Sequence, residues 1–321
     1  MKRSFHIYIA LSLISCADIF AQADISMATH WNNRANYNPA SIARTDYLFI
    51  YFNTRKQWMG VNGAPTVFNI QSSEYFNDIS SAIGVHLVGD YIGASQVYNP
   101  MFTYAYRIAK KDRWAMAMGL SAGVFARTVN GSLFEADNTN DPSIFFNYEN
   151  KTKPDLNVGF EFQNLHFIYG FSSTHLFSIG KSDSLFLNTN HQYGYAIYKN
   201  DDPQTFSYSA GIQIVNRKDF IDAEANFSFR LKHLPKTING PLLKGPQEVL
   251  DIGITCRTSR QITLLCGIMV TPYLRIGYAY DQSLLTRLRN NETHEIMIEY
   301  RIPARAASAT VRCGSKEFWY H

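Results

Sequence analysis

The residues that could do chemistry in this chain do not fall at the spacings of known catalytic motifs. The nine histidines are scattered, and none has a nucleophile or a carboxylate at a motif distance. A Ser–His or Asp–His site assembled only by folding is left open as an alternative. The sequence therefore predicts no catalytic residue.

Oxygen-bearing side chains alternate between Asp137 and Asp141, as they do in a calcium-binding loop. Such a loop also needs a later glutamate that binds through both oxygens, and Glu149 comes too late if Asp137 is the first ligand. Asn, Asp and Pro are common in turns, so we interpret the segment as a turn. No His-rich or Cys-x-x-Cys spacing occurs, and we expect neither a metal nor a cofactor.

Charged and amide residues instead recur at alternate positions of strand-like segments, opposite bulky apolar residues. In residues 98–108, for example, Tyr104 and Tyr106 share one face and Arg107 lies on the other. Successive side chains of a strand point to opposite sides of a sheet. A soluble sandwich would bury the bulky face, whereas a transmembrane barrel turns that face to lipid and lines its interior with the other.

The start of the chain indicates export. A basic beginning is followed by an apolar run at residues 7–14 and by the small-residue site Ala21-Gln22-Ala23, which predicts a signal peptide cut before Asp24 or one or two residues earlier. Residues 13–16 also resemble a lipobox, so acylation at Cys16 is an open alternative. Either processing takes the mature chain out of the cytoplasm.

The composition agrees with a barrel in the outer membrane of a Gram-negative cell. No later run of about 18 apolar residues occurs, so no helix is expected to cross a membrane. Aromatic residues make up 14% of the chain and charged residues 17%, which is typical of a barrel with lipid-facing rings. The formal charge is only +4 and no basic cluster is interleaved with aromatic residues, so nucleic acid is not an expected partner.

Cys256, Cys266 and Cys313 follow the predicted signal peptide. A hairpin turning near residues 258–259 would place Cys256 opposite residue 261 or 262. Cys266 would then lie roughly 13 Å further along its strand. Because bridged Cα atoms lie within about 7 Å of each other, we expect no disulfide between Cys256 and Cys266 and interpret both as small apolar residues.

Alternation and turn residues together predict an all-β fold, a transmembrane antiparallel β-barrel of about 14 strands. An even count is the rule for single-chain bacterial barrels and returns both ends to the periplasm. The longest links, 128–154 and 173–189, are then expected outside the cell, and 232–246 forms a long periplasmic link. The predicted strands are 47–57, 65–73, 81–88, 98–108, 113–127, 155–163, 165–172, 190–199, 205–215, 220–231, 247–257, 260–269, 272–281 and 292–302.

The predicted signal peptide and strands divide the chain into four parts. Residues 1–23 are the signal peptide, 24–44 a periplasmic N-terminal segment, 45–302 the transmembrane β-barrel and 303–321 a periplasmic C-terminal tail.

The predicted barrel interior carries charges of both signs between small residues. A basic residue on the lipid face would cost ~2–4 kcal/mol at mid-bilayer, so these groups are expected inside. Two interpretations stay open: the charges neutralise one another and only shape the barrel, or the interior holds a partner's segment or passes solute. The predicted interior polar residues are Arg107, Asp155, Asn157, Glu161, Gln213, Asp222, Glu224, Asn226, Arg275, Asp281, Glu295, Glu299 and Arg301.

Residues 55–65, R-K-Q-W-M-G-V-N-G-A-P, resemble the R-x-Q-W-x-G-x-x-G-A-P signature of the PorP/SprF family. Further segments are similar to other family elements in the same order and cover nearly all of the mature chain. They are Asn38-Pro39-Ala40, Asp90-Tyr91-Ile92-Gly93, Tyr104-Ala105-Tyr106-Arg107, Asn140-Asp141-Pro142, residues 275–281 (R-I-G-Y-A-Y-D) and His294-Glu295-Ile296-Met297.

The resemblance implies an outer-membrane β-barrel component of the type IX secretion system, without enzymatic activity. This system carries proteins with a conserved C-terminal domain across the outer membrane and serves gliding motility in some species. The implied partners are periplasmic lipoprotein and peptidoglycan-binding components, a secreted substrate with a C-terminal sorting domain, and outer-membrane lipid. The stretch 232–246 and the tail 313–321 depart from the family pattern and put the choice of paralogue in doubt.

Several family-motif residues have a structural interpretation. Gly60, Gly63 and Pro65 predict a tight turn, and Trp58 suits the membrane interface or recognition. Asn38-Pro39-Ala40 is expected outside the barrel, as a periplasmic contact, a plug element or part of a disordered leader. Phe318, Trp319 and Tyr320 are expected to form a docking patch or to pack under the rim. The full set of motif positions is Asn38, Pro39, Arg55, Gln57, Trp58, Gly60, Gly63, Pro65, Tyr106, Arg107, Tyr278, Asp281, His294 and Glu295.

Three function classes therefore remain. The first is a secretion-system barrel without enzymatic activity, which the ordered motifs favour. The second is an outer-membrane diffusion porin, and the third is an outer-membrane hydrolase with a site among the interior acids. Barrels host all three, so the fold alone does not choose among them.

Overall fold

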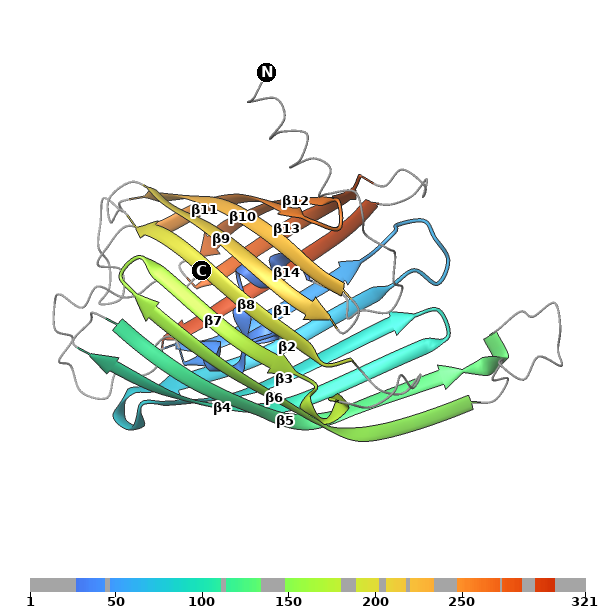
Figure 1. Ribbon diagram of the computed structural model, residues 1–321. Helices are drawn as coiled ribbons and strands as arrows, with labels where there is room; N and C mark the ends of the chain where they lie inside the picture. The colour runs from blue at the N-terminus through green and yellow to red at the C-terminus, as the bar shows by residue number, and fades with distance from the viewer. Residues whose placement is uncertain are drawn as a thin grey trace, which may run out of the picture.

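Fourteen strands close into one antiparallel barrel in the computed structural model (Figure 1). The structure describes residues 27–43, 47–110, 114–133, 148–179, 189–201, 206–217, 220–233, 247–271, 273–284 and 292–303. Each strand pairs with its neighbours in sequence, and β1 closes the ring against β14. The predicted fold class and strand count are confirmed. The signal peptide, residues 137–142, Cys313 and residues 318–320 lie outside the described residues.

The strand bounds agree closely with the predicted ones. They are β1 (Tyr47–Lys56), β2 (Thr66–Phe76), β3 (Ser81–Ile92), β4 (Ser95–Lys110), β5 (Trp114–Asn130), β6 (Tyr148–Asn164), β7 (Phe167–Thr174), β8 (His191–Asp201), β9 (Phe206–Arg217), β10 (Phe220–His233), β11 (Gln247–Arg257), β12 (Gln261–Thr271), β13 (Leu274–Ser283) and β14 (Glu292–Pro303). Short 3-10 helices lie in three connections: η4 (Asn77–Ile79), η5 (Gly131–Leu133) and η6 (Leu176–Ser178). In the described part, no helix combines the length and apolarity needed to cross a membrane.

The two faces of the wall differ as the alternation predicts. On β4, Ala105 is fully buried whereas Tyr106 exposes 48% of its surface to the outside. Large apolar side chains such as Met118 and Ile212 are exposed around the outer face, and polar ones such as Arg275 are buried inside. A closed ladder also pairs the backbone groups that hydrocarbon could not satisfy. Cys256 lies opposite Ile262 in the register, and neither Cys256 nor Cys266 is in a disulfide, as expected.

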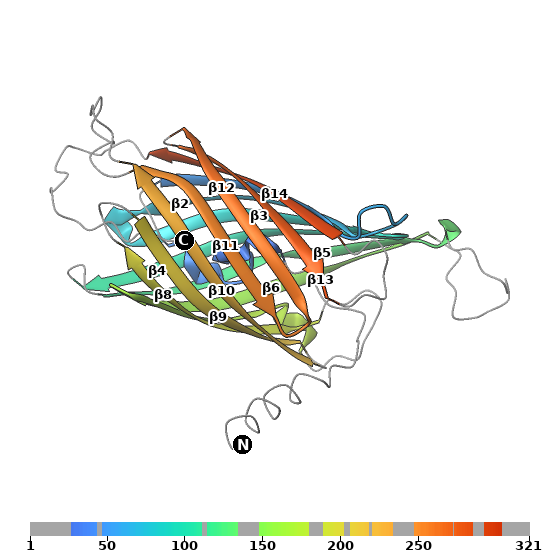
Figure 2. The same cartoon turned by 90° about the horizontal axis from the view of Figure 1, so that it is seen from above.

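The wall is taller on one side than the sequence suggested. The link 128–154 was predicted as loop, but β5 continues to Asn130 and β6 already begins at Tyr148. The two extensions pair with each other, Asn130 opposite Tyr148, and project beyond the ring as a hairpin (Figure 2). Their polar and proline-containing sequence hides the strand, because the ladder partner, not local propensity, supplies its hydrogen bonds.

The barrel has two distinct ends. At one, which we call the terminal end, β1 starts at Tyr47 and β14 stops at Pro303. At the other, the hairpin end, lie the β1–β2 turn (57–65) and the β5–β6 hairpin, on the right of Figure 1.

Residues 27–43 form a compact segment inside the ring of strands, which we call the plug (Figures 1 and 2). It consists of three 3-10 helices, η1 (Ala28–Trp31), η2 (Arg34–Asn36) and η3 (Pro39–Ile42). The expectation that Asn38-Pro39-Ala40 lies outside the barrel is therefore wrong, and the plug alternative is the one observed. The segment is polar because its partners are the polar side chains of the lumen, which no local sequence pattern reveals.

Candidate functional site

The lumen and its plug bring together most of the buried polar residues of the described chain. Two asparagines set the local shape of the plug. The side-chain oxygen of Asn33 accepts a hydrogen bond from the backbone N–H of Ala35 at 3.2 Å, and that of Asn38 accepts one from Ala40 at 3.0 Å. Pro39 occupies the first turn of η3, where its missing N–H costs nothing. The Asn-Pro-Ala element is thus a helix start.

Glu295 on β14 anchors the beginning of the plug. Its carboxylate accepts backbone N–H groups from Ala28 at 2.7 Å and Thr29 at 2.9 Å, and the Thr29 hydroxyl donates to it as well. Asn53 donates to it at 2.6 Å, and Arg55 lies 3.1 Å away, both from β1. Glu295 is 1% exposed, so these charge-assisted bonds are formed away from water.

Arg34 and Asn38 fasten the middle of the plug to the opposite wall. The Arg34 Nε lies 3.0 Å from Glu161 Oε2 on β6, and the Tyr195 hydroxyl on β8 donates to the same carboxylate at 2.5 Å. The Asn38 amide donates to the Tyr195 hydroxyl at 2.8 Å and to the Phe160 carbonyl at 3.0 Å. Burial is the largest single effect and by itself would lower the pKa of Arg34. The charge of Glu161, its hydrogen bond to Arg34 and the nearby Tyr195 and Tyr37 hydroxyls together outweigh burial and raise the pKa, so Arg34 stays cationic.

Glycines in the wall make room for the plug. Gly119 on β5 and Gly159 on β6 stand opposite each other in the register. A Cβ added at Gly119 would lie 2.3 Å from the Ala40 nitrogen, and one at Gly159 would lie 2.0 Å from Asn38 Oδ1. Neither position tolerates a side chain while the plug is seated. The small inner face that the sequence showed is therefore a seat for the chain's own N-terminal segment.

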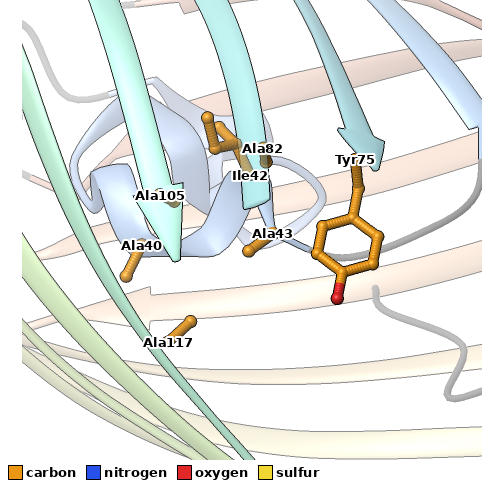
Figure 3. Close-up of a cluster of buried hydrophobic side chains, with 7 residues drawn as sticks. All are labelled: Ala40, Ile42, Ala43, Tyr75, Ala82, Ala105 and Ala117. Atoms are coloured by element: carbon orange, nitrogen blue, oxygen red, sulfur yellow. The ribbon is translucent and has the colours of Figure 1, made fainter. Parts of the chain in front are cut away.

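Apolar contacts complete the seat at two places, on β2–β5 and on β7–β8. Figure 3 shows the cluster at the end of the plug, formed by Ala40, Ile42 and Ala43 with Tyr75, Ala82, Ala105 and Ala117 from the wall. A second cluster joins Trp31 and Tyr37 of the plug to Ile168, Tyr195 and Ile197.

The wall from β10 through β14 to β1 is mainly charged, although Ala28 of the plug also packs against Leu265 and Ala279 there. Arg257 lies 2.7 Å from Glu224 and 3.5 Å from Asp281, and Arg55 lies 2.5 Å from Asp281. His30 of the plug contacts Glu224. Towards the terminal end, the ion pairs are Arg275 with Asp251 and Glu299, and Arg301 with Glu299. The interior charges thus pair with one another, as the first of the two interpretations expects, but they do more than shape the barrel, because Glu224 and Glu295 also bind the plug.

A family model described as type IX secretion system membrane protein PorP/SprF matches residues 19–300. The chain belongs to the PorP/SprF family. No curated protein matches it.

Solved outer-membrane barrels are distant from this PorP/SprF protein. The outer membrane protein Omp33 of Acinetobacter baumannii is 12% identical with a TM-score of 0.43, covering 80% of this chain and 98% of its own. The monoaromatic hydrocarbon channel CymD is 10% identical with a TM-score of 0.46, covering 88% and 94%. The toluene transporter TodX of Pseudomonas putida is 8% identical with a TM-score of 0.46, covering 87% and 94%.

The PorP/SprF motif positions separate into three groups in the structure. Lumen positions are Asn38, Pro39, Arg55, Asp281 and Glu295, all buried, together with half-buried Arg107, whose guanidinium lies 5.5 Å from the centre of the Tyr75 ring. Outer-face positions are Tyr106, Tyr278 and His294, and the Tyr278 hydroxyl lies 2.6 Å from His294 Nδ1. Turn positions are Gln57, Trp58, Gly60, Gly63 and Pro65.

The β1–β2 turn has the tight geometry that its glycines predict. Gly60 and Gly63 have positive φ angles of 95° and 72°, and Trp58 adopts a positive φ of 47°. The Gln57 N–H donates to the Pro65 carbonyl at 2.9 Å, which closes the turn. Trp58 is partly exposed at the hairpin end and does not contribute to the plug seat.

Among the residues that sequence reasoning missed are Thr29 and Arg34 of the PorP/SprF plug and Asn53 and Tyr195 of its seat. Asn53 follows a stretch that is apolar on both faces, and Tyr195 looked like another wall aromatic. Two features of the sequence could have indicated the role of Arg34. It lies in a polar segment that is too short to fold alone, and the predicted barrel interior has more acidic than basic residues, which leaves acids for Arg34 to pair with. Among the described residues, no group of three or more His, Cys, Asp and Glu is arranged to hold a metal.

Proposed function

We propose that this PorP/SprF protein is a non-enzymatic scaffold of the type IX secretion system in the outer membrane. It supports the secretion or surface attachment of substrates with a C-terminal sorting domain, and gliding in species that glide. The observation that carries this proposal is the seated plug. A lumen filled by the protein's own segment and fixed by buried ion pairs suits a protein that works through contacts at its two ends.

The expected orientation of the barrel supports a different partner for each end. The outer face is apolar and suits outer-membrane lipid. In bacterial barrels with an even strand count, the start of the first strand and the end of the last strand both lie on the periplasmic side, so the terminal end would meet the periplasmic lipoprotein and peptidoglycan-binding components. The hairpin end, with its projecting β5–β6 hairpin, would meet the secreted substrate. Residues 1–23 would direct export as a signal peptide.

The proposal is tested with a deletion strain and affinity purification. We expect the deletion to reduce the amount of one or more secreted or surface-bound proteins with a C-terminal sorting domain, and the full chain to restore it. Affinity purification of the full chain from outer membrane should recover periplasmic lipoprotein or such a substrate. Purification of the barrel alone, together with an unchanged secreted fraction, would contradict the proposal.

A conductance measurement separates the scaffold from a diffusion porin. In planar bilayers the full chain should show no stepwise conductance, whereas a variant lacking residues 27–43 should conduct. Stable conductance steps from the full chain, without a secretion defect on deletion, would identify a porin instead.

A further inference from the structure

The plug runs through the lumen in a defined direction. Its last residues, Ile42 and Ala43, pack against Tyr75 and Ala82, which lie where β2 ends and β3 begins, at the terminal end. The chain then enters β1 at the same end. Its first residues lie in the hairpin half of the barrel, because Ala28 and Thr29 bind Glu295, close to the start of β14.

A second contact confirms that position. His30 contacts Glu224, which lies near the start of β10 at the hairpin end, and Glu224 is bound by Arg257, the last residue of β11. The plug therefore spans the lumen from the terminal end at Ala43 to the hairpin half at Met27.

The distances from Glu295 to the two rims of the barrel indicate at which end the N-terminus of the processed chain lies. Glu295 lies three residues from the start of β14, which at ~3.4 Å per residue is at most ~10 Å from the hairpin rim. It lies eight residues from Pro303, so the terminal end is roughly 27 Å away. With cleavage before Asp24, three residues precede Met27, and they reach about 10 Å when extended. That length suffices to reach the hairpin rim, whereas the distance back to the terminal end is longer and the lumen on that side is occupied by the plug.

We infer that the plug carries the mature N-terminus through the lumen to the hairpin end, so that the free α-amino group faces the cell surface. This rests on the orientation given under the proposed function and on removal of the signal peptide. β14 ends at Pro303 at the terminal end, on the side of the barrel opposite to the one that the first residues of the plug approach.

Labelling of intact cells tests the inference on the full chain. A membrane-impermeant amine reagent is applied, the protein is digested with trypsin, and the peptide from Asp24 to Arg34 is examined by mass spectrometry. This peptide contains no lysine, so a label on it marks the α-amino group. Lys151, exposed on the β5–β6 hairpin, reports the hairpin end, and an Ile79→Lys substitution in exposed η4 reports the terminal end.

We expect the α-amino group and Lys151 to be labelled in intact cells, and the lysine introduced by Ile79→Lys only after the outer membrane is permeabilised. An α-amino group labelled only after permeabilisation, or only after denaturation, would overturn the inference while leaving the orientation intact. A retained leader would overturn it as well. Reversed marker lysines would instead overturn the proposed orientation, and surface exposure with it.

A pair of glycine variants gives a second readout. Gly119→Val places a side chain against the backbone of Ala40, whereas Gly194→Val adds one where a Cβ meets nothing within 4 Å. We expect α-amino labelling of intact cells to fall several-fold in the first variant and to stay unchanged in the second, with Lys151 labelled equally in both. Equal α-amino labelling in the two variants would contradict delivery through the seated plug.

Discussion

The two walls of the lumen bind the same segment by different means. The wall of β10–β14 and β1 meets the first residues of the plug with carboxylates, above all Glu295, inside a network of arginines. The wall of β2–β8 meets its last residues with glycine, alanine and aromatic side chains that leave a fitted space. Ion pairs and charged hydrogen bonds hold the first residues of the plug, and close packing holds the last ones. Substitutions on the two walls should therefore differ in how much they destabilise the protein.

The largest effect is expected on the charged wall. Glu295→Ala removes the acceptor of two backbone N–H groups and leaves the Arg55 charge with Asp281 alone. Breaking a buried ion pair costs about 3–5 kcal/mol, so unfolding in urea should begin at a clearly lower concentration. Hydrogen exchange of the Ala28 and Thr29 amides should also accelerate. Glu292→Ala, exposed on the same strand, is the matched control, and equal losses in both variants would contradict the anchor.

An intermediate effect is expected for the ion pair between the plug and the β2–β8 wall. A double-mutant cycle of Arg34→Met and Glu161→Gln measures the ion pair that links η2 to β6. Residues in direct contact are coupled by about 0.5–3 kcal/mol, and we expect a value in the upper half because both side chains are buried. The free energies of unfolding of the four proteins give this coupling. Strict additivity of the two single variants would show that Arg34 contributes nothing through Glu161.

The smallest effect is expected from apolar packing at the end of the plug. Ile42→Val removes one methylene from the cluster with Ala82 and Ala105, which should cost about 0.5–1.5 kcal/mol in the free energy of unfolding. Conductance should stay absent, because the charged anchor remains. Ile79→Val, exposed in η4, should change stability by less than the error of the measurement. A channel opened by Ile42→Val would mean that shape alone keeps the plug seated.

The sequence by itself determined the wall of this protein. Alternation fixes which face of each strand meets lipid, and the inner positions Arg275, Asp281, Glu295 and Glu299 are buried as predicted. Strand pairing between sequence neighbours leaves little choice of topology, so the closed ring of fourteen strands follows from local pattern. The family motifs identified the secretion system for the same reason, since they are spread over the whole barrel.

Only the tertiary structure decided what fills that wall. Asn38 and Pro39 carry no periodic signal, and the residues that Asn38 binds on the wall, Phe160 and Tyr195, lie more than a hundred residues away in the chain. The sequence alone predicts Gly119 and Gly159 to be small residues that line the lumen. Only the structure shows that the plug occupies the space beside them. A strand's face is a local property of its own residues, whereas a plug's seat exists only when distant side chains converge on it.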